Sequence, residues 1–229
     1  MSDLEDDVCQ ILGITKERLK NFDTELVETV KEKIRKKLEA NPNEMKLIKY
    51  PSNSLVLKSN LVTDFNKEIE VFTRQLKIFA RRLSQVSLSA PQVNFNFQVA
   101  VILLDALDMK LKSNYEQLGY PDVLINPTYV PLDSLKVKTI ETCSSLPGVK
   151  GYVERHKNIK VTYSDLNGTL KELEVTGIDN LNSYGIIVQH EIDHLNGTLI
   201  VDKFSSIDQG RNFSSLKNLK EQEGSIATK

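Results

Sequence analysis

The residues whose types and spacing point most clearly to chemistry lie in "QHEIDH", residues 189–194. His190 and His194 are four residues apart, so on a helix their imidazoles lie on the same face, one turn apart. They can therefore bind one metal ion, and Glu191 beside them is placed to move a proton of a water at that ion. The same letters also suit a solvated helix whose histidines hydrogen-bond nearby groups. The motif alone leaves both interpretations open.

A metal site with two histidines needs a third ligand, and its identity separates the enzyme classes that use this motif. In metzincin proteases a third histidine follows the glycine by three residues; Gly197 is in place here, but the ligand position is Ile200. A distant glutamate, as in thermolysin-like proteases, remains open. So does Cys143 in "ETCSSLPG", although a lone cysteine is more often a small buried apolar residue. A thiolate, two histidines and an open fourth position suit Zn²⁺ or Fe²⁺ in a hydrolase.

Three segments occur in the order and spacing of the three motifs of peptide deformylases, and through them the chain resembles that family. They are "LSAPQV" at 88–93, "ETCSSLPGVKGYVER" at 141–155 and "QHEIDHLNGTL" at 189–199. The resemblance covers roughly residues 47–204. Within it, "LSAPQVN" and "HLNGTL" most resemble the plastid-type deformylases of apicomplexan parasites. It implies an α+β fold in which mixed, mainly antiparallel sheets pack around the HExxH helix.

The resemblance implies that one divalent ion, Fe²⁺ or Zn²⁺, is held by the motif cysteine and the two histidines, here Cys143, His190 and His194. Glu191 would then be the general acid and base. The implied reaction removes the formyl group from N-formylmethionyl peptides or nascent proteins, some of them at the ribosome. Two alternatives are a related metallohydrolase of another acylated amine and a non-catalytic binding protein. The retained metal and acid–base residues favour an enzyme.

The substrate side of the site is implied by the first and second motifs. The side-chain amide of Gln92 and the backbone N–H of Ser144 would donate hydrogen bonds to the developing oxyanion. An extended substrate would pair with the backbone of the residues that line the site, which are Val86, Ser87 and Leu88.

The chain departs from the family where the motifs normally hold glycine. Gln85 and Ser87 stand at such positions in the first motif and Thr142 in the second, where Ser144 also replaces a usual leucine. Glycine permits close backbone approach and positive φ angles, which a β-branched residue disfavours. We expect these side chains to narrow the cleft or to move the oxyanion donor, with strain at Thr142 if it keeps a glycine conformation.

Three charged residues accompany the ligands in these motifs. Glu141 and Asp193 are candidate hydrogen-bond acceptors for the ligand histidines, or else ordinary ion-paired carboxylates. Arg155 is most simply a structural ion-pair partner.

The elements that must position these residues follow from the spacing of apolar residues. A helix is predicted from about Ser183 to Gly197 and another from Asp64, its expected cap, to about Ser84. Residues 45–62 are expected to hold an entry strand and a turn, and "LNG" at 166–168 a hairpin turn. Further strands are predicted in "FQVAVILL", "VLINPTYV", "LKVKTIET", "NIKVTYSDLNG" and "TLKELEVTGI".

Three regions are expected along the chain. Residues 1–43 read as a helical extension with an apolar stripe, residues 44–204 as the catalytic domain, and residues 205–229 as a polar, loosely ordered tail. The 229 residues are 40% hydrophobic, which suffices for one substantial core.

The chain's overall charge narrows the function classes. A net charge of −1 argues against binding to nucleic acid or to a membrane surface, and no apolar run reaches membrane-spanning length. Two cysteines indicate reduced thiols rather than a disulfide framework. The resemblance implies a plastid-like organelle, with the cytoplasm as the alternative, and no targeting segment is visible.

Overall fold

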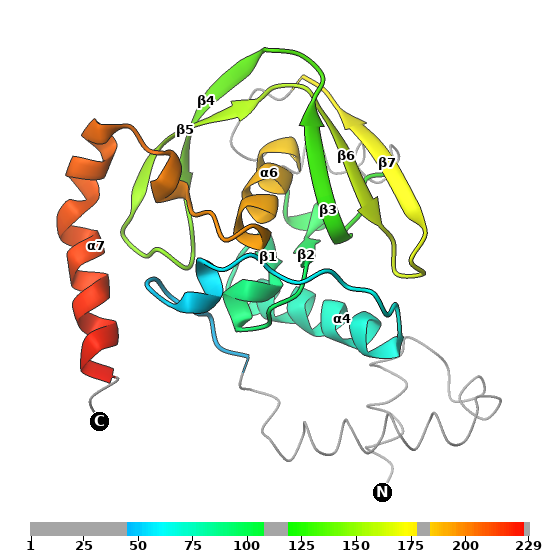
Figure 1. The fold of residues 1–229 in the computed structure, drawn as a ribbon, viewed down its shortest axis with the longest axis horizontal. Coiled ribbons are helices and arrows are strands. Elements are labelled where there is room, and N and C mark those ends of the chain that lie inside the picture. Colours follow the sequence, from blue (N-terminus) through cyan, green and yellow to red (C-terminus); the bar gives the residue numbers. More distant parts are fainter. Residues whose placement is uncertain (1–44, 108–118, 178–183, 227–229) are drawn as a thin grey trace, which may run out of the picture. The chain divides into compact units, whose positions relative to one another are not determined.

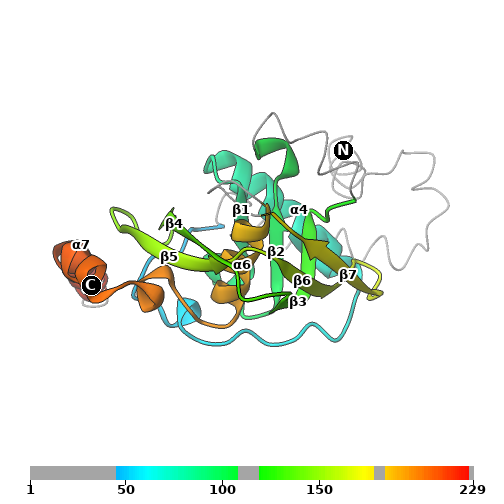
Figure 2. The ribbon, with the colours of Figure 1, turned by 90° about the horizontal axis from the view of Figure 1, so that it is seen from above.

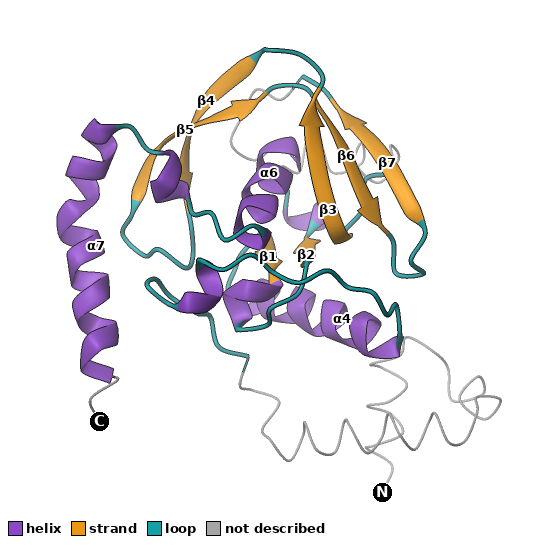
Figure 3. Cartoon of the chain, in the orientation of Figure 1, coloured by secondary structure: helices purple, strands orange, loops and turns teal. Residues whose placement is uncertain are grey.

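The computed structural model of the chain describes residues 45–107, 119–177 and 184–226, with side chains as far as Glu221. The helix expected before residue 41 lies outside the described residues. Contacts divide the chain into two units, Met1–Lys46 and Leu47–Lys229, and the second contains every described helix and strand. Its helices and antiparallel sheets confirm the predicted α+β class (Figure 3).

Five strands form the larger sheet, in the order β1-β2-β3-β6-β7, and each neighbouring pair is antiparallel. These strands are β1 (Ser87–Ser89), β2 (Val99–Ile102), β3 (Val123–Pro131), β6 (Ile159–Ser164) and β7 (Leu170–Val175). Gly168, at φ +78°, lies in the turn between β6 and β7, as the "LNG" hairpin predicted. Among the described strands β1 pairs only with β2, so it is an edge strand of this sheet.

The smaller sheet is a hairpin of β4 (Lys136–Thr142) and β5 (Lys150–His156). The sequence pattern predicted β4 but not β5. The inward-facing residues of β5 are Gly151, Val153 and Arg155, only one of which is a typical strand residue. A Cβ at Gly151 would lie 2.7 Å from the Phe204 ring, so glycine is needed where this ring covers the hairpin.

The helix that carries the HExxH motif, α6 (Tyr184–Leu195), lies between the two sheets (Figure 1). All its residues are buried except His190, which is partly exposed. Tyr184, Ile187, Val188 and Ile192 pack in one core with apolar residues of β2, β3, β6 and β7. The alternative interpretation of "HEIDH" as a solvated helix is therefore wrong.

A second long helix, α4 (Lys67–Arg82), packs against β1 and β2. The expectation that Asp64 caps this helix is wrong. The side chain of Asn66 accepts hydrogen bonds from the N–H groups of Glu68 and Ile69, while Asp64 accepts one from Asn66. Asn66 is the cap because it directly precedes Lys67, the first residue of α4. Its side-chain oxygen can therefore reach the unpaired N–H groups of the first helical turn.

The expectation of a loosely ordered tail is also wrong, since α7 (Ser206–Ile226) is a helix beside β5 (Figure 2). Asn212 bonds the backbone of Lys150 in both directions, at 3.1 Å from its N–H and 2.8 Å to its C=O. Leu219, at 6% exposure, packs in a second core under the hairpin. Asn212 and Leu219, spaced by about two turns, thus dock one face of this helix, while Ile207 and Phe213 of the same helix are exposed.

The segment before α4 holds no strand among residues 45–66, contrary to the expected entry strand; it forms the short 3₁₀ helix η1 (Asn53–Leu55). The other 3₁₀ helices are η2 (Ala90–Val93), η3 (Leu104–Ala106) and η4 (Ile200–Lys203). Of the helices in the described ranges, none combines the length and the apolar character that crossing a membrane requires.

Candidate active site

Three potential metal ligands meet where the end of β4 passes α6. Cys143 follows β4 directly, and His190 and His194 come from successive turns of α6. The Cys143 Sγ lies 3.2 Å from His194 Nε2, and one ligand atom from each of the three residues lies within 4.8 Å of the others. One sulfur and two imidazole nitrogens this close together fit a single ion of the zinc or iron type.

The electrostatics of this cluster favour a thiolate. Burial acts to raise the pKa of the Cys143 thiol, but His194 and His190 more than offset it and lower this pKa to about 5. Burial acts to lower the pKa of His190, and hydrogen bonds with Cys143 and Glu141 raise it to about 10. The cluster therefore places a negative sulfur beside a positive imidazole. A metal cation would take the place of the imidazole proton.

Glu141 fixes the orientation of one ligand. Its Oε2 lies 3.0 Å from His190 Nδ1, and because an ionised carboxylate only accepts, Nδ1 carries the proton and Nε2 is left to bind metal. Burial acts to raise the pKa of Glu141, but hydrogen bonds from Arg155 and His190 lower it to about 2. Glu141 is therefore ionised, as this contact requires.

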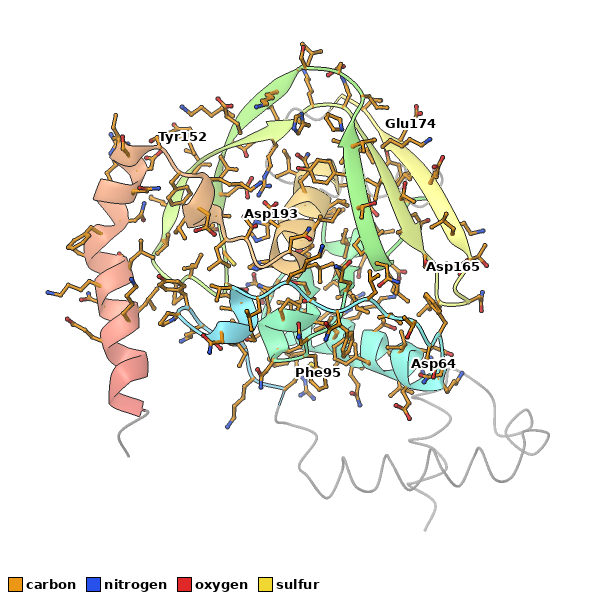
Figure 4. The ribbon with its side chains drawn as sticks, in the orientation of Figure 1. Asp64, Phe95, Tyr152, Asp165, Glu174 and Asp193 are labelled. Carbon is orange, nitrogen blue, oxygen red and sulfur yellow. The ribbon has the colours of Figure 1, made fainter. Side chains whose placement is uncertain are left out.

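Arg155 holds the carboxylates around the cluster, which confirms its expected role as an ion-pair partner. It is 1% exposed and donates to Glu141 from Nε at 2.6 Å and from Nη2 at 2.7 Å. Its Nη1 donates to Asp193, labelled on α6 in Figure 4, and Lys203 pairs with the other Asp193 oxygen at 3.0 Å. The suggestion that Asp193 orients a ligand histidine is therefore wrong. The Nδ1 of His194 has no hydrogen-bond partner within the described parts of the chain.

Glu191, adjacent to the first ligand histidine, is 1% exposed. Its Oε1 accepts a hydrogen bond from the Ser87 hydroxyl at 2.6 Å. Its Oε2 is buried and has no hydrogen-bond partner in the residues that the structure describes. One oxygen of this carboxylate is thus held, and the other is free to exchange a proton with a small molecule in the cleft.

Gln92, in η2, presents its amide nitrogen to the cluster. Its Oε1 accepts from the Ser89 N–H at 2.9 Å and the Ser89 hydroxyl at 3.1 Å, so the two groups fix which way the amide points. Its Nε2 lies 3.3 Å from Ser145 Oγ, 3.4 Å from Ser144 Oγ and 3.9 Å from Cys143 Sγ. An amide donor is therefore aimed at the space beside the cysteine.

A cleft of about 360 Å³ opens over the cluster. Of the residues named from the sequence, the structure brings Val86, Ser87, Gln92, Cys143, Ser144, His190 and Glu191 to its lining. His194 completes the cluster beneath the lining at 2% exposure, and Leu88 is fully buried, so only its backbone can serve a substrate. The edge of β1 that has no partner strand among the described residues borders the same space, because Ser87 lies in β1 and lines the cleft.

The substituted glycine positions are accommodated without backbone strain. Thr142 pairs with Lys150 in the hairpin and is not among the described residues with positive φ, so the expected strain there is wrong. The Gln85 side chain donates to the C=O of Leu83 at 3.1 Å. Both side chains border the cleft, and the Ser87 hydroxyl points to Glu191.

Two contributions to the site were missed in the sequence. Ser89 orients Gln92, and its signal was present, because serine three residues before glutamine is the pattern of a capping box. The segment before η1 holds the site loops through backbone bonds from Ile48 to Gln92 at 2.8 Å and from Tyr50 to Ser145 at 2.9 Å. Nothing in the side chains of these residues could have shown it.

Comparison with known proteins identifies the same family that the three sequence motifs resemble. A sequence model described as polypeptide deformylase matches residues 44–210. A peptide deformylase of Campylobacter jejuni is 32% identical over 161 residues, which is 70% of this chain and 86% of that protein. A solved peptide deformylase of Plasmodium falciparum in complex with an inhibitor is 32% identical, with a TM-score of 0.65 over 77% of this chain and 99% of that one. A solved peptide deformylase 1B of Arabidopsis thaliana, 22% identical with a TM-score of 0.69 over 81% of this chain and 94% of that one, shares the fold.

Proposed function

Because this chain belongs to the polypeptide deformylase family, a family of metal-dependent hydrolases, we propose that its cleft binds N-formylmethionyl peptides and hydrolyses their formyl group. The observation that carries the proposal is the Cys143–His190–His194 cluster, with Glu191 and Gln92 beside it on one cleft. Metal ligands, a proton carrier and an amide donor are the set that hydrolysis of an amide needs.

The proposed ligands of the metal are Cys143, His190 and His194, whose donor atoms are close enough for one ion. A divalent ion held there would supply an electrophile that makes a water acidic enough to attack at neutral pH. Fe²⁺ and Zn²⁺ both accept one thiolate and two imidazoles, and we propose one of these two ions.

Glu191 is the proposed general acid and base. The protein leaves its Oε2 without a partner in the described residues, so this oxygen can take a proton from the attacking water. The same oxygen can then return the proton to the amine that leaves. Burial of this side chain, at 1% exposure, keeps competing solvent away from the transfer.

Gln92 and Ser144 are the proposed donors to the oxyanion that develops on the formyl oxygen. The amide of Gln92 is held by Ser89 and directed toward Cys143 and Ser144, so it needs no rearrangement when charge develops. The backbone N–H of Ser144, the residue after the ligand cysteine, is the second proposed donor. Such fixed donors favour the transition state over the neutral substrate.

The peptide itself is proposed to bind as an added strand along β1. Among the described strands β1 pairs only with β2, and the Val86 C=O accepts from the Leu103 N–H just after β2 at 2.7 Å. Because backbone groups point to alternate sides along a strand, those of Ser87 face the open side, and the proposed peptide pairs there with Val86 and Leu88 flanking it. Nascent chains presented at the ribosome are included among the proposed substrates.

We also propose that residues 44–204 are the catalytic domain, with residues 1–43 an extension. The family match at 44–210 supports this boundary. The proposed location is a plastid-like organelle, supported by the similarity to the Plasmodium falciparum protein and by the restriction of formylated initiation to bacteria and organelles of bacterial origin.

The test is release of formate from formyl-Met-Ala-Ser by protein prepared without oxygen, with acetyl-Met-Ala-Ser as the matched substrate. Metal content is measured on the same preparation. We expect formate release and no acetate release. Acetate release at a comparable rate would favour a hydrolase of other acylated amines, and tight peptide binding without any release would favour a non-catalytic binding protein.

A further inference from the structure

The hydrogen bond between Ser87 and Glu191 joins two motifs that lie 104 residues apart. Ser87 opens β1 and Glu191 lies in the middle of α6, which packs against β1. The oxygens are 2.6 Å apart, and since the carboxylate only accepts, the serine hydroxyl donates. A hydrogen bond to a charged acceptor is shorter and stronger than one between neutral groups.

This contact is the only hydrogen bond that the structure gives to the Glu191 carboxylate within the described residues. A glutamate side chain has three rotatable bonds, so a carboxylate with no partner can turn among several rotamers. The Ser87 bond selects one of them, and it occupies Oε1 alone. A glycine or alanine at position 87 would have no hydroxyl to do this.

We propose that Ser87 is a positioning residue for Glu191, whose hydroxyl holds one carboxylate oxygen and thereby orients the other for proton transfer. The inference rests on the proposed role of Glu191 as proton carrier. Ser87 acts through Glu191 and passes no proton itself. The residue that departs from the usual glycine thus supports the acid–base step instead of obstructing the cleft.

The test compares Ser87→Ala, which removes the hydroxyl, with Ser87→Thr, which keeps one. Ser59→Ala is the matched control, because the Ser59 hydroxyl is also buried but has no hydrogen-bond partner in the described part of the chain. We expect Ser87→Ala to lower kcat on formyl-Met-Ala-Ser by about 10-fold to 100-fold, because losing one hydrogen bond to a charged group changes an equilibrium by about this factor. KM should change less than about threefold, since the backbone that would bind the peptide is kept. Ser87→Thr should recover most of this loss, and Ser59→Ala should match wild type.

A double-variant cycle separates positioning from a general structural effect. In the Glu191→Gln background there is no carboxylate to position, so adding Ser87→Ala should lower the residual rate by less than twofold. A full additional loss in that background would overturn the proposal. So would a Ser87→Ala enzyme as fast as wild type, a faster one, or one that loses through KM alone.

Crystal structures give a readout that needs no activity. In wild type and Ser87→Thr the Glu191 carboxylate should take one position within hydrogen-bond distance of residue 87, and in Ser87→Ala it should move or take several. The same carboxylate position in all three would overturn the proposal. If wild type releases no formate, the proposed function fails, and this comparison still decides whether Ser87 positions Glu191.

Discussion

Three buried carboxylates lie close to the cluster of Cys143, His190 and His194, and they differ in their hydrogen-bond partners. They are Glu141, Glu191 and Asp193. Glu141 and Asp193 share Arg155, and each has a further partner, His190 for Glu141 and Lys203 for Asp193, so both carboxylates are held in place. Glu191 has only the Ser87 hydroxyl as a partner among the described residues, which leaves its second carboxylate oxygen available for the proposed proton transfer. At the scale of residues, the hydrogen-bond donors thus distinguish the two carboxylates that support the site, Glu141 and Asp193, from the proposed proton carrier Glu191.

Glu191→Gln should keep the fold and the metal but lose most of the turnover, because an amide cannot accept and return a proton. General acid–base groups contribute roughly 10²–10⁴-fold, and we expect a loss in kcat of that size. The measurements are kcat on formyl-Met-Ala-Ser and metal content of the same sample. A loss under tenfold at full metal content would show that another group carries the proton.

Arg155→Met should lower the free energy of unfolding by about 3–5 kcal/mol, because it takes the guanidinium away from the buried carboxylate of Glu141 and leaves Asp193 with Lys203 alone. The matched control is Lys136→Met. Lys136 pairs with Glu154 on the same hairpin at 3.7 Å, but both side chains are at least half exposed, so the change should cost at most about 1 kcal/mol. Urea unfolding measures the free energy of unfolding of both variants. Equal losses in the two would contradict the supporting role given to Arg155.

The residues proposed to do the chemistry could be picked out from the sequence because binding an ion and transferring a proton need particular residue types at particular spacings. His190, Glu191 and His194 follow from the geometry of one helix, and Cys143 required the family resemblance. The Ser87 contact could not be predicted, since it joins β1 to α6 and depends on how closely the two pack. Asp193 was misjudged for the same reason, because its partners come from β5 and from Lys203 after α6.

At the scale of elements, α6 must end where it does so that the chain can turn toward η4. Gly197 lies just beyond the helix at φ +71°, with its N–H bonded to the C=O of His194 at 3.0 Å. A Cβ there would lie 2.6 Å from the C=O oxygen of Val56. Both the backbone conformation and the space require glycine at this position, three residues after His194.

Gly197→Ala should therefore destabilise the protein by about 1–3 kcal/mol and lower metal affinity, since the last turn of α6 carries His194. The matched control is Gly210→Ala in α7, where a new Cβ would have no atom within 4 Å among the described residues apart from the adjacent backbone of α7 itself. In a helix interior that change should stabilise by about 0.5–1 kcal/mol. Thermal unfolding of the two variants measures both signs, and a neutral Gly197→Ala would refute the account of the helix end.

The sequence predicted those helices and strands whose buried face is marked by regularly spaced apolar residues. It missed those whose position depends on contacts with distant parts of the chain. The apolar residues of α6, β2, β3, β4 and β6 indicated these elements correctly. β5 was missed because Gly151 and Arg155 face inward, and α7 was missed because few of its residues are apolar. In both cases the stabilising partner is distant in sequence: Phe204 covers Gly151, and Asn212 bonds Lys150.

At the scale of the whole molecule, every site residue lies between Gln85 and His194, but the support of the site begins earlier. Ile48 and Tyr50 bond the backbone of Gln92 and Ser145, the loops that carry the proposed oxyanion donors. The boundary at residue 44 leaves this segment with the catalytic domain. Removing it should loosen the site without removing a single catalytic group.

Two truncations test this. A chain starting at Glu44 should keep its metal and its kcat, since both backbone bonds remain. A chain starting at Ser52 loses two hydrogen bonds of about 1 kcal/mol each and should show a lower midpoint of thermal unfolding and a reduced kcat at unchanged metal content. Loss of activity already in the folded chain that starts at Glu44 would mean that residues 1–43 complete the site.

The most direct measurement of the central claim is formate release from formyl-Met-Ala-Ser while metal-stripped protein is titrated with Fe²⁺ or Zn²⁺ without oxygen. The account predicts that the rate rises in proportion to added ion and stops rising at one ion per chain. The same titration of Cys143→Ala should give no rise at stoichiometric ion, because the thiolate ligand is missing. Full activity before any ion is added, or a Cys143→Ala protein that reaches the wild-type rate at one ion per chain, would contradict the account.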